Sequence, residues 1–230
     1  MMRNSIRSIF AAFIFLSAAV SSAVAQGTLT GKVLFEGTPP VSEQVDVKSD
    51  VPVCGTHKEV AKLTLGADKG VADAVVRILD IPGAPAAKDG HLDQVGCQFV
   101  PHVQVIPLDS TLVITSSDSV LHNAHGFYED GSTAFNIAVP IVGMEMKKKL
   151  KKPGVIKLRC DAGHTWMSGY IIVADNPYYA VTGADGQFTI EGIPPGDHEI
   201  EIWQEWLGKT VRKVSIKDGS NEFSVVLKKD

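Results

Sequence analysis

The stretch Val155-Ile156-Lys157-Leu158-Arg159-Cys160-Asp161-Ala162-Gly163-His164-Thr165-Trp166-Met167 joins an alternating apolar pattern to a short polar segment. From Ile156 to Cys160, apolar side chains alternate with charged ones, a period of two that is typical of a β-strand with one buried face. Cys160 is therefore expected to point the same way as the core side chains, at the end of the strand. His164 and Met167 follow it on the next loop.

A thiolate, an imidazole and a thioether on one short loop form a soft ligand set that suits copper. Cys160, His164 and Met167 supply these groups, and His122 is expected to bring a second imidazole from the loop after the predicted strand 111–115. Two imidazoles and a thiolate in one plane, with a weak axial thioether, hold both oxidation states of copper in similar geometries. These residues predict a site for one mononuclear copper ion that acts in electron transfer.

Two other histidines are alternative ligands. His125 lies three residues after His122 and either replaces it or forms an exposed edge through which the electron leaves. We prefer His122 because Asn123 follows it. His102 is an alternative extra ligand, although a hydrogen-bonded structural role is the expectation for it.

Most of the remaining chain also reads as strands separated by turn residues. The predicted strands are 28–35, 71–79, 103–106, 111–115, 155–160, 170–173, 188–190, 199–203, 211–216 and 223–227. Residues 81–93, rich in Pro, Ala and Gly, are expected to form a loop, and no segment has a convincing amphipathic helix pattern. The sequence predicts an all-β fold, most economically a sandwich.

Residues 60–175 resemble the cupredoxin family of small blue-copper proteins in the order of their motifs. The resemblance rests on Phe99-Val100-Pro101 before a strand, on His122-Asn123, on Pro153-Gly154 before the strand 155–160, and on the loop 160–167 with the strand after it. It implies a Greek-key, cupredoxin-like β-sandwich or barrel.

The resemblance also implies a role for each site residue. His122, Cys160 and His164 would be equatorial copper ligands and Met167 the axial one. Asn123 would hydrogen-bond around the thiolate and tie the two ligand loops together. Three residues separate Cys160 from His164 and two separate His164 from Met167, unlike the commonest plastocyanin-type and azurin-type loops.

The C-terminal part, residues 178–229, resembles the carboxypeptidase regulatory-like, transthyretin-like β-sandwich family. Asp185-Gly186 predicts a tight hairpin turn, because glycine readily adopts positive φ. In that family, Gly-x-Val and Ala-x-Val strands come before this hairpin, whereas here 31–33 and 74–76 lie before the copper motif. We expect a smaller, discontinuous sandwich; the alternative gives these early strands to the cupredoxin sheet.

The predicted domains follow from these two resemblances. Residues 26–175 would form the cupredoxin-like domain with an N-terminal extension, and residues 176–230 the regulatory-like domain, completed in the discontinuous option by strands within 28–80. The second domain is expected to stabilise the protein or to dock it, since this fold carries no chemistry of its own.

Residues 1–25 read as a secretory signal peptide. Arg3 and Arg7 precede an apolar run, and Ala23-Val24-Ala25 has the small-residue pattern of a cleavage site. A periplasmic or secreted protein is expected, and an uncleaved amino-terminal anchor is the alternative. No later stretch reaches the roughly 18 apolar residues of a membrane span, so none is expected in the mature protein.

The cysteine count is odd, which leaves one thiol to explain in a secreted protein. Cys54 and Cys97 lie in glycine-flanked, loop-like settings, whereas Cys160 ends a strand pattern next to His164. We expect a Cys54–Cys97 disulfide and a free Cys160. A disulfide between Cys160 and either of the others is the alternative.

The net charge and the absence of known catalytic motifs exclude some classes of function. Without Arg3 and Arg7 the chain has 20 basic and 26 acidic side chains, a net charge of −6, which argues against nucleic acid as a partner. The run Lys147–Lys152 is either a solvated face or a docking site for an anionic redox partner. The sequence has no Ser-His-Asp set, zinc-protease motif or phosphate loop, so we expect no enzyme.

The leading functional prediction is a periplasmic mononuclear copper protein that acts in electron transfer. One alternative is a copper-binding or delivery protein without redox cycling. Another is a metal-free cell-surface β module.

Overall fold

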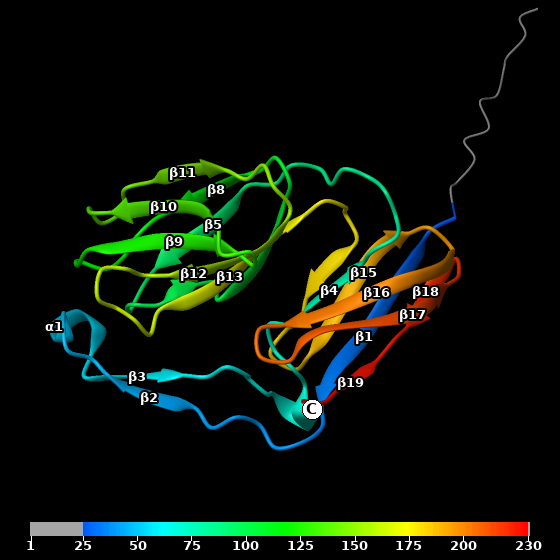
Figure 1. Cartoon of the computed structure of the whole chain (residues 1–230). Coiled ribbons are helices and arrows are strands. Elements are labelled where there is room, and N and C mark those ends of the chain that lie inside the picture. The colour runs from blue at the N-terminus through cyan, green and yellow to red at the C-terminus, as the bar shows by residue number, and fades with distance from the viewer. Residues whose placement is uncertain (1–24, 230) are drawn as a thin grey trace, which may run out of the picture.

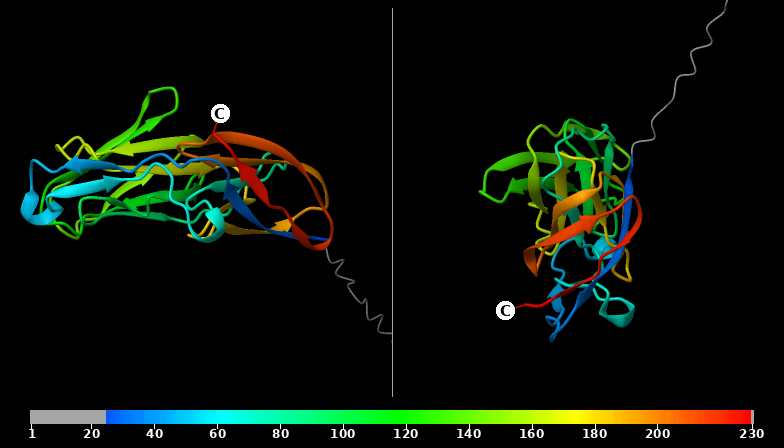
Figure 2. Two further views of the ribbon diagram at one scale, coloured as in Figure 1. Left: turned by 90° about the horizontal axis from the view of Figure 1, so that it is seen from below. Right: turned by 90° about the vertical axis from the view of Figure 1, so that its right-hand side faces the viewer.

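The computed structural model describes residues 25–229, so the predicted signal peptide lies outside the described residues except for Ala25. Almost every element is a strand, which confirms the all-β prediction. The strands form two lobes, with a long hairpin that runs beneath one of them (Figure 1). The lobes lie end to end in an elongated molecule (Figure 2).

The first lobe is a sandwich of two sheets. One sheet has the order β10 (Thr133–Val139), β9 (His122–Tyr128), β12 (Gly154–Arg159), β13 (Ser168–Ala174), β7 (Val103–Pro107). The other has the order β11 (Met146–Lys149), β8 (Thr111–Ile114), β5 (Gly90–Gln94), β6 (Phe99–Val100). Buried side chains from both sheets, among them Leu92, Ile114, Ile156, Leu158 and Ile171, form one core. This packing gives a cupredoxin-like β-sandwich.

The second lobe is a smaller sandwich, also of two sheets. In one, β1 (Gly27–Phe35) lies between β15 (Gln187–Ile193) and β18 (Gly219–Glu222), and its far end pairs with β19 (Val225–Leu227). The other has the order β14 (Tyr179–Val181), β4 (Val75–Ile78), β16 (Gly196–Gln204), β17 (Gly208–Ile216). Its core includes Leu29, Val33, Val76, Ile200 and Ile202.

The strand pairing of the second lobe is discontinuous in sequence. β4 pairs with β16, with Val75 opposite Trp203 and Ile78 opposite Ile200, and β1 pairs with β15. Both early strands therefore complete the C-terminal sheets, and the first lobe is inserted between β4 and β14.

The segment between β1 and β4 forms the hairpin under the first lobe. Its strands are β2 (Glu43–Asp46) and β3 (His57–Val60), its tip carries the one-turn helix α1 (Val51–Cys54), and the short 3-10 turn η1 (Ala67–Lys69) follows. Cys54 is bonded to Cys97 of the first lobe, which is the expected disulfide. The tip of the hairpin is thus covalently attached to the lobe.

A small apolar cluster joins the two lobes. Val103 and Ile172 of the first lobe pack against Val75 and Trp203 of the second. The rings of Tyr170 and Trp203 meet edge to face, with centroids 5.1 Å apart. The lobes therefore share a packed interface.

The sequence-based prediction of the strands needs correction. The loop expected over 81–93 ends early, because Gly90 begins β5; a Cβ atom there would lie 2.2 Å from the end of the Ile106 side chain, which would then have to move. Several strands were not predicted, among them β2, β3, β9, β10 and β11. The segment of β9 mixes histidine and asparagine into a pattern that reads as a loop.

No helix among the described residues is long and apolar enough to cross a membrane.

Candidate metal centre

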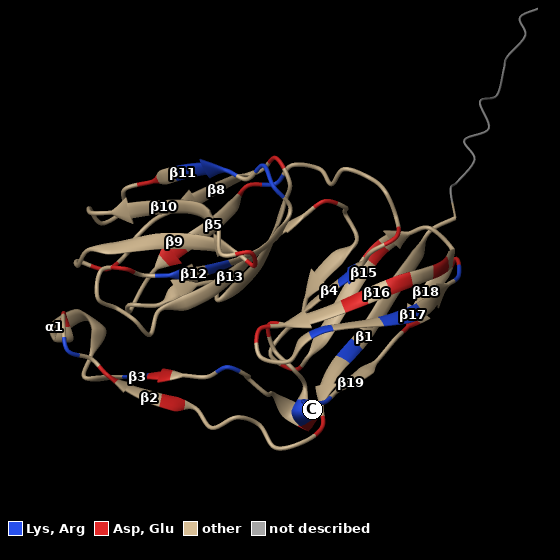
Figure 3. Ribbon diagram, in the orientation of Figure 1, with Lys and Arg blue, Asp and Glu red and all other residues tan. Residues whose placement is uncertain are grey.

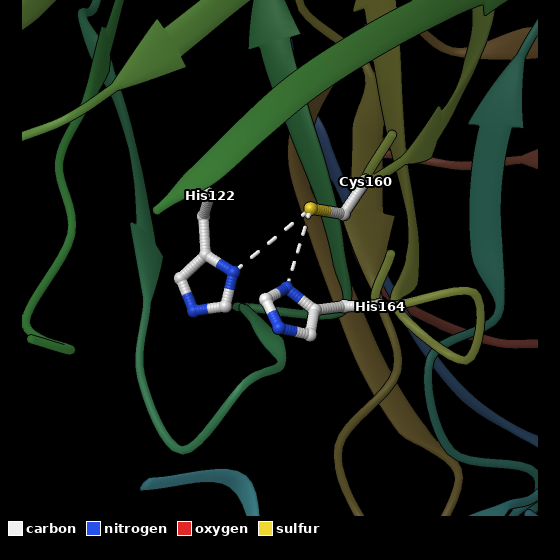
Figure 4. A group of neighbouring side chains, drawn as sticks. All are labelled: His122, Cys160 and His164. Carbon is white, nitrogen blue, oxygen red and sulfur yellow. Dashed lines mark hydrogen bonds between the residues drawn. The ribbon is translucent and has the colours of Figure 1, made fainter. Parts of the chain in front are cut away.

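Three buried side chains meet at one end of the first lobe. The Cys160 Sγ atom lies 3.9 Å from Nδ1 of His122 and 3.7 Å from Nδ1 of His164 (Figure 4). One potential ligand atom from each residue lies within 4.8 Å of the others. Both imidazoles are 0% exposed and Cys160 is 4% exposed.

The strand order explains why these residues meet. β9 and β12 are antiparallel neighbours, with Arg159 opposite His125, so the start of β9 lies beside the end of β12. His122 begins β9 and Cys160 directly follows β12. In β12, Ile156 and Leu158 are buried, and Cys160 continues this buried face as the alternation predicted.

The loop after Cys160 turns back toward the sulfur. Gly163 has a φ of +95°, a conformation that other residues rarely adopt, and the Met167 N–H donates to the His164 carbonyl at 3.0 Å. The turn places the His164 ring 4.6 Å from the His122 ring, measured between centroids. Met167 is 2% exposed and belongs to the same core. Its role as axial ligand stays a prediction.

Each imidazole also contacts a carboxylate through its other nitrogen. Nε2 of His122 lies 2.9 Å from Oδ2 of Asp118, and Nε2 of His164 lies 2.9 Å from Oδ2 of Asp50. A carboxylate accepts hydrogen bonds, so it favours the tautomer with the proton on Nε2 and leaves the Nδ1 lone pair toward the sulfur. This is the form of histidine that binds a metal. Sequence reasoning missed both aspartates.

The electrostatics favour a neutral imidazole at His122. Burial lowers the pKa of His122, and this effect outweighs the hydrogen bond that the ring donates to Asp118, which acts in the opposite direction. A neutral ring keeps a free lone pair for a metal ion.

Asn123 connects the two ligand segments. Its Oδ1 accepts a hydrogen bond from the Asp161 backbone N–H at 2.6 Å, and its Nδ2 donates to Oδ1 of Asn136 at 2.7 Å. Because Asn123 follows His122 and Asp161 follows Cys160, this one side chain holds the neighbours of two candidate ligands together.

The structure places His125 and His102 outside the buried group. Nδ1 of His125 lies 2.5 Å from the Asp161 carboxylate, and the His125 side chain is 12% exposed. His102 lies between the lobes, where Nδ1 contacts the Ser168 carbonyl at 3.2 Å and Nε2 contacts Glu205 at 2.6 Å. Both histidines have hydrogen-bond partners that account for their positions.

A second group of nearby donors consists of Cys97, Asp118 and His122. Cys97 is in the disulfide and offers no thiolate. The Asp118 carboxylate already accepts hydrogen bonds from the backbone N–H groups of Gly96 and Cys97, each at 2.7 Å. This group is a hydrogen-bond network beside the first one, and it does not form a separate metal site.

The first group fits a copper ion chemically. It offers one sulfur and two imidazole nitrogens from three buried residues, and the surrounding side chains belong to the apolar core. Sulfur and imidazole ligands in a site closed to water suit copper better than magnesium or calcium, which prefer oxygen.

The chain matches no protein-family model and no curated protein. It is similar in structure to a purple cupredoxin from Nitrosopumilus maritimus, at 24% identity over 37% of this chain and 100% of that one, with a TM-score of 0.33. A pseudoazurin from Sinorhizobium has 22% identity over 37% of this chain and 73% of that one, with a TM-score of 0.31. A copper-containing nitrite reductase from Thermus scotoductus SA-01 has 23% identity over 42% of this chain but 26% of that one, with a TM-score of 0.32. Each alignment covers less than half of this chain.

The lysine run lies on the edge of the smaller sheet. β11 pairs only with β8 among the described strands, and its positive charge is evident in Figure 3. Met146 is opposite Ile114 and Lys149 is opposite Thr111, so the run moves along β8 away from the loop that leads to His122. A partner that docks on this run would approach the side of the sandwich.

Proposed function

We propose that this protein binds one copper ion at His122, Cys160 and His164, with Met167 as the axial ligand, and transfers single electrons. The observation that carries the proposal is the pair of Nδ1 atoms, 3.9 and 3.7 Å from one buried thiol. Bound copper would supply a one-electron couple. The protein supplies the ligands, their orientation and a site closed to water.

The rigidity of the site supports electron transfer. The three side chains are buried, both rings have a second partner at Nε2, and Asn123 links the two ligand segments. A ligand set that is held in place changes little when the metal gains or loses an electron, and a small rearrangement makes transfer fast. The same rigidity is less useful in a protein that must release copper to another one.

The remaining parts of the proposal concern location and partners. The predicted signal peptide and the Cys54–Cys97 disulfide favour an oxidising compartment such as the periplasm. A redox protein is the proposed partner, and the lysine run is one candidate docking site. We propose no enzymatic reaction. The second lobe is proposed to be a transthyretin-like module that stabilises or docks the protein.

A copper titration with absorption spectra tests the proposal. One equivalent of Cu(II) is expected to give an intense thiolate-to-copper band and reversible reduction. The variant Cys160→Ser should lose the band, whereas His125→Ala, the matched control in the neighbouring strand, should keep it. A colourless protein that binds only Cu(I) would favour copper delivery, and a protein that binds no copper would favour a metal-free module.

A further inference from the structure

We infer that Asp50 and Asp118 are positioning residues of the metal centre, each orienting one histidine, and that the Cys54–Cys97 disulfide holds both aspartates in place. The inference rests on the proposed copper site but uses contacts that exist without the metal. It assigns a role to the hairpin that lies outside the sandwich.

Asp118 is anchored from three sides. Its carboxylate accepts hydrogen bonds from the backbone N–H groups of Gly96 and Cys97 and contacts Nε2 of His122 at 2.9 Å. The residue is 8% exposed. A buried carboxylate with three donors has little freedom to move, so it holds the His122 ring in one orientation.

Asp50 reaches the other histidine from the tip of the hairpin. It has a positive φ of 56°, directly before α1, and its carbonyl accepts hydrogen bonds from the N–H groups of Val53 and Cys54. Its carboxylate contacts Nε2 of His164, whose side chain is 0% exposed although it lies on a loop. A Cβ atom on Gly163 would lie 3.6 Å from Oγ of Ser49, so the hairpin packs directly on the ligand loop.

The disulfide connects the two aspartates. Cys54 follows Asp50 by one helical turn and donates its N–H to the Asp50 carbonyl at 2.8 Å. Cys97 donates its N–H to Asp118, and its carbonyl accepts the indole N–H of Trp166 at 3.0 Å. The disulfide therefore links the segment that holds Asp50, the partner of His164, to the segment that holds Asp118, the partner of His122. Through the Cys97 carbonyl it is also connected to the ligand loop that carries Trp166.

This arrangement has two chemical consequences. Each carboxylate keeps the proton on Nε2, so both Nδ1 lone pairs face the sulfur, and each adds negative charge close to the metal position. Negative charge favours Cu(II) over Cu(I), so the aspartates should lower the reduction potential. Loss of such a partner typically weakens metal binding 10- to 100-fold.

Imidazole nitrogen NMR of the metal-free protein tests the positioning directly. In the wild type, His122 and His164 should both carry the proton on Nε2. Asp50→Ala should disturb only His164, Asp118→Ala only His122, and Cys54→Ser with Cys97→Ser both. The matched control is Asp46→Asn, which removes an exposed carboxylate from the same hairpin and should leave both rings unchanged.

The copper-loaded protein gives the second readout. Asp50→Asn keeps a hydrogen-bond acceptor but removes the charge, and is expected to weaken Cu(II) binding 10- to 100-fold. With Cu(I) binding unchanged, this corresponds to a potential about 60 to 120 mV higher, at 59 mV per tenfold change. Asp46→Asn should leave the potential at the wild-type value.

The two proposals fail in different ways. A protein that binds no copper but shows the expected ring tautomers would overturn the copper function and leave the positioning role intact. Folded Asp50 and Asp118 variants with wild-type tautomers would overturn the positioning role. A folded, disulfide-free protein with both rings unchanged would remove the role of the disulfide.

Discussion

The side-chain oxygen of Asn123 accepts a hydrogen bond from the backbone N–H of Asp161, at 2.6 Å. These two residues follow His122 and Cys160 in the chain, so the bond sets the spacing between an imidazole and the thiol. It is a local contact between neighbouring antiparallel strands, and it needs no metal ion.

We expect Asn123→Ala to loosen the site. The variant leaves the Asp161 N–H and the Asn136 side chain without their partner, which should lower the free energy of unfolding by about 1–3 kcal/mol. With copper bound, the reduction potential should change as well, because the two ligand segments are less tightly held. Denaturant unfolding and voltammetry measure the two effects, and an unchanged potential would show that the link is purely structural.

Substitutions of His122 and His125 should differ sharply in their effect on the absorption band of the copper-loaded protein. His122→Ala removes a nitrogen 3.9 Å from the sulfur and should abolish the intense absorption band of the copper-loaded protein. His125→Ala removes a half-buried ring that is hydrogen-bonded to Asp161 outside the buried group, and the band should persist. Absorption spectra after addition of one equivalent of Cu(II) distinguish them. The opposite outcome would transfer the ligand role to His125.

The meeting of Cys160, His164 and His122 at one site was predictable in part from the sequence. The alternation before Cys160 predicts a buried thiol at a strand end, and His164 follows on the same loop, so both positions depend on local patterns. His122 required the further assumption that a second loop reaches the same end. The pairing of β9 with β12 supplies that connection, although β9 was not recognised as a strand.

The two aspartates differ in whether the sequence alone could have identified them. Asp118 precedes His122 by four residues, so a search for carboxylates near candidate ligands would have found it. Asp50 is 114 residues from His164 in the chain, and no local pattern connects them. Its position depends on the hairpin and on the disulfide, and both are properties of the folded chain. For the second lobe, the expected pairing of the early strands came from the order of the Gly-x-Val, Ala-x-Val and Asp-Gly segments in the family that they resemble, and not from the sequence pattern alone.

Removal of the disulfide should destabilise the protein. Cys54 and Cys97 are 43 positions apart, and closing a loop of this size lowers the entropy of the unfolded chain by an amount worth about 4 kcal/mol. The double variant with serine at both positions should unfold at a lower denaturant concentration than the wild type. A reduced wild-type sample is the control for the substitutions themselves. Equal midpoints in the oxidised and reduced forms would contradict the expectation.

The contact between His102 and Glu205 should make stability depend on pH. Burial lowers the pKa of His102, but the hydrogen bond and charge of Glu205, together with the charge of Asp73, outweigh it, so the pKa is raised. A raised pKa in the folded state stabilises the protein below the unfolded value of about 6.5, and this contribution is lost as the pH rises through the folded pKa.

His102→Gln tests this contribution. The variant should cost about 1–2 kcal/mol more at pH 5.5 than at pH 8.5, because only the charged histidine can donate to Glu205 and to the Ser168 carbonyl at the same time. Unfolding measurements at the two pH values give the difference. His57→Gln, which removes an exposed pair with Asp46, is the control and should show little effect at either pH. An equal cost of His102→Gln at both values would mean that the histidine does not change its charge between pH 5.5 and pH 8.5.

Among the glycines of the turn before β15, Gly186 should lose the most stability on substitution. Gly186 has a φ of +79°, and a Cβ atom there would lie 2.4 Å from the Val33 carbonyl oxygen, which belongs to β1. Gly186→Ala therefore combines an unfavourable backbone conformation with a clash against a backbone atom, and should lower the free energy of unfolding by about 2 kcal/mol or more.

Gly183, in the same turn, provides the matched control. A Cβ atom on Gly183 would meet only the Asp185 side chain, at 3.4 Å, which is an ordinary contact. Gly183→Ala should cost less than about 1 kcal/mol. Because the turn packs on β1, a loss from Gly186→Ala well above the roughly 1 to 2 kcal/mol that a positive φ alone costs would support the contact with the first strand in solution. Equal effects of the two variants would contradict that contact, and the copper spectrum should be the same in both.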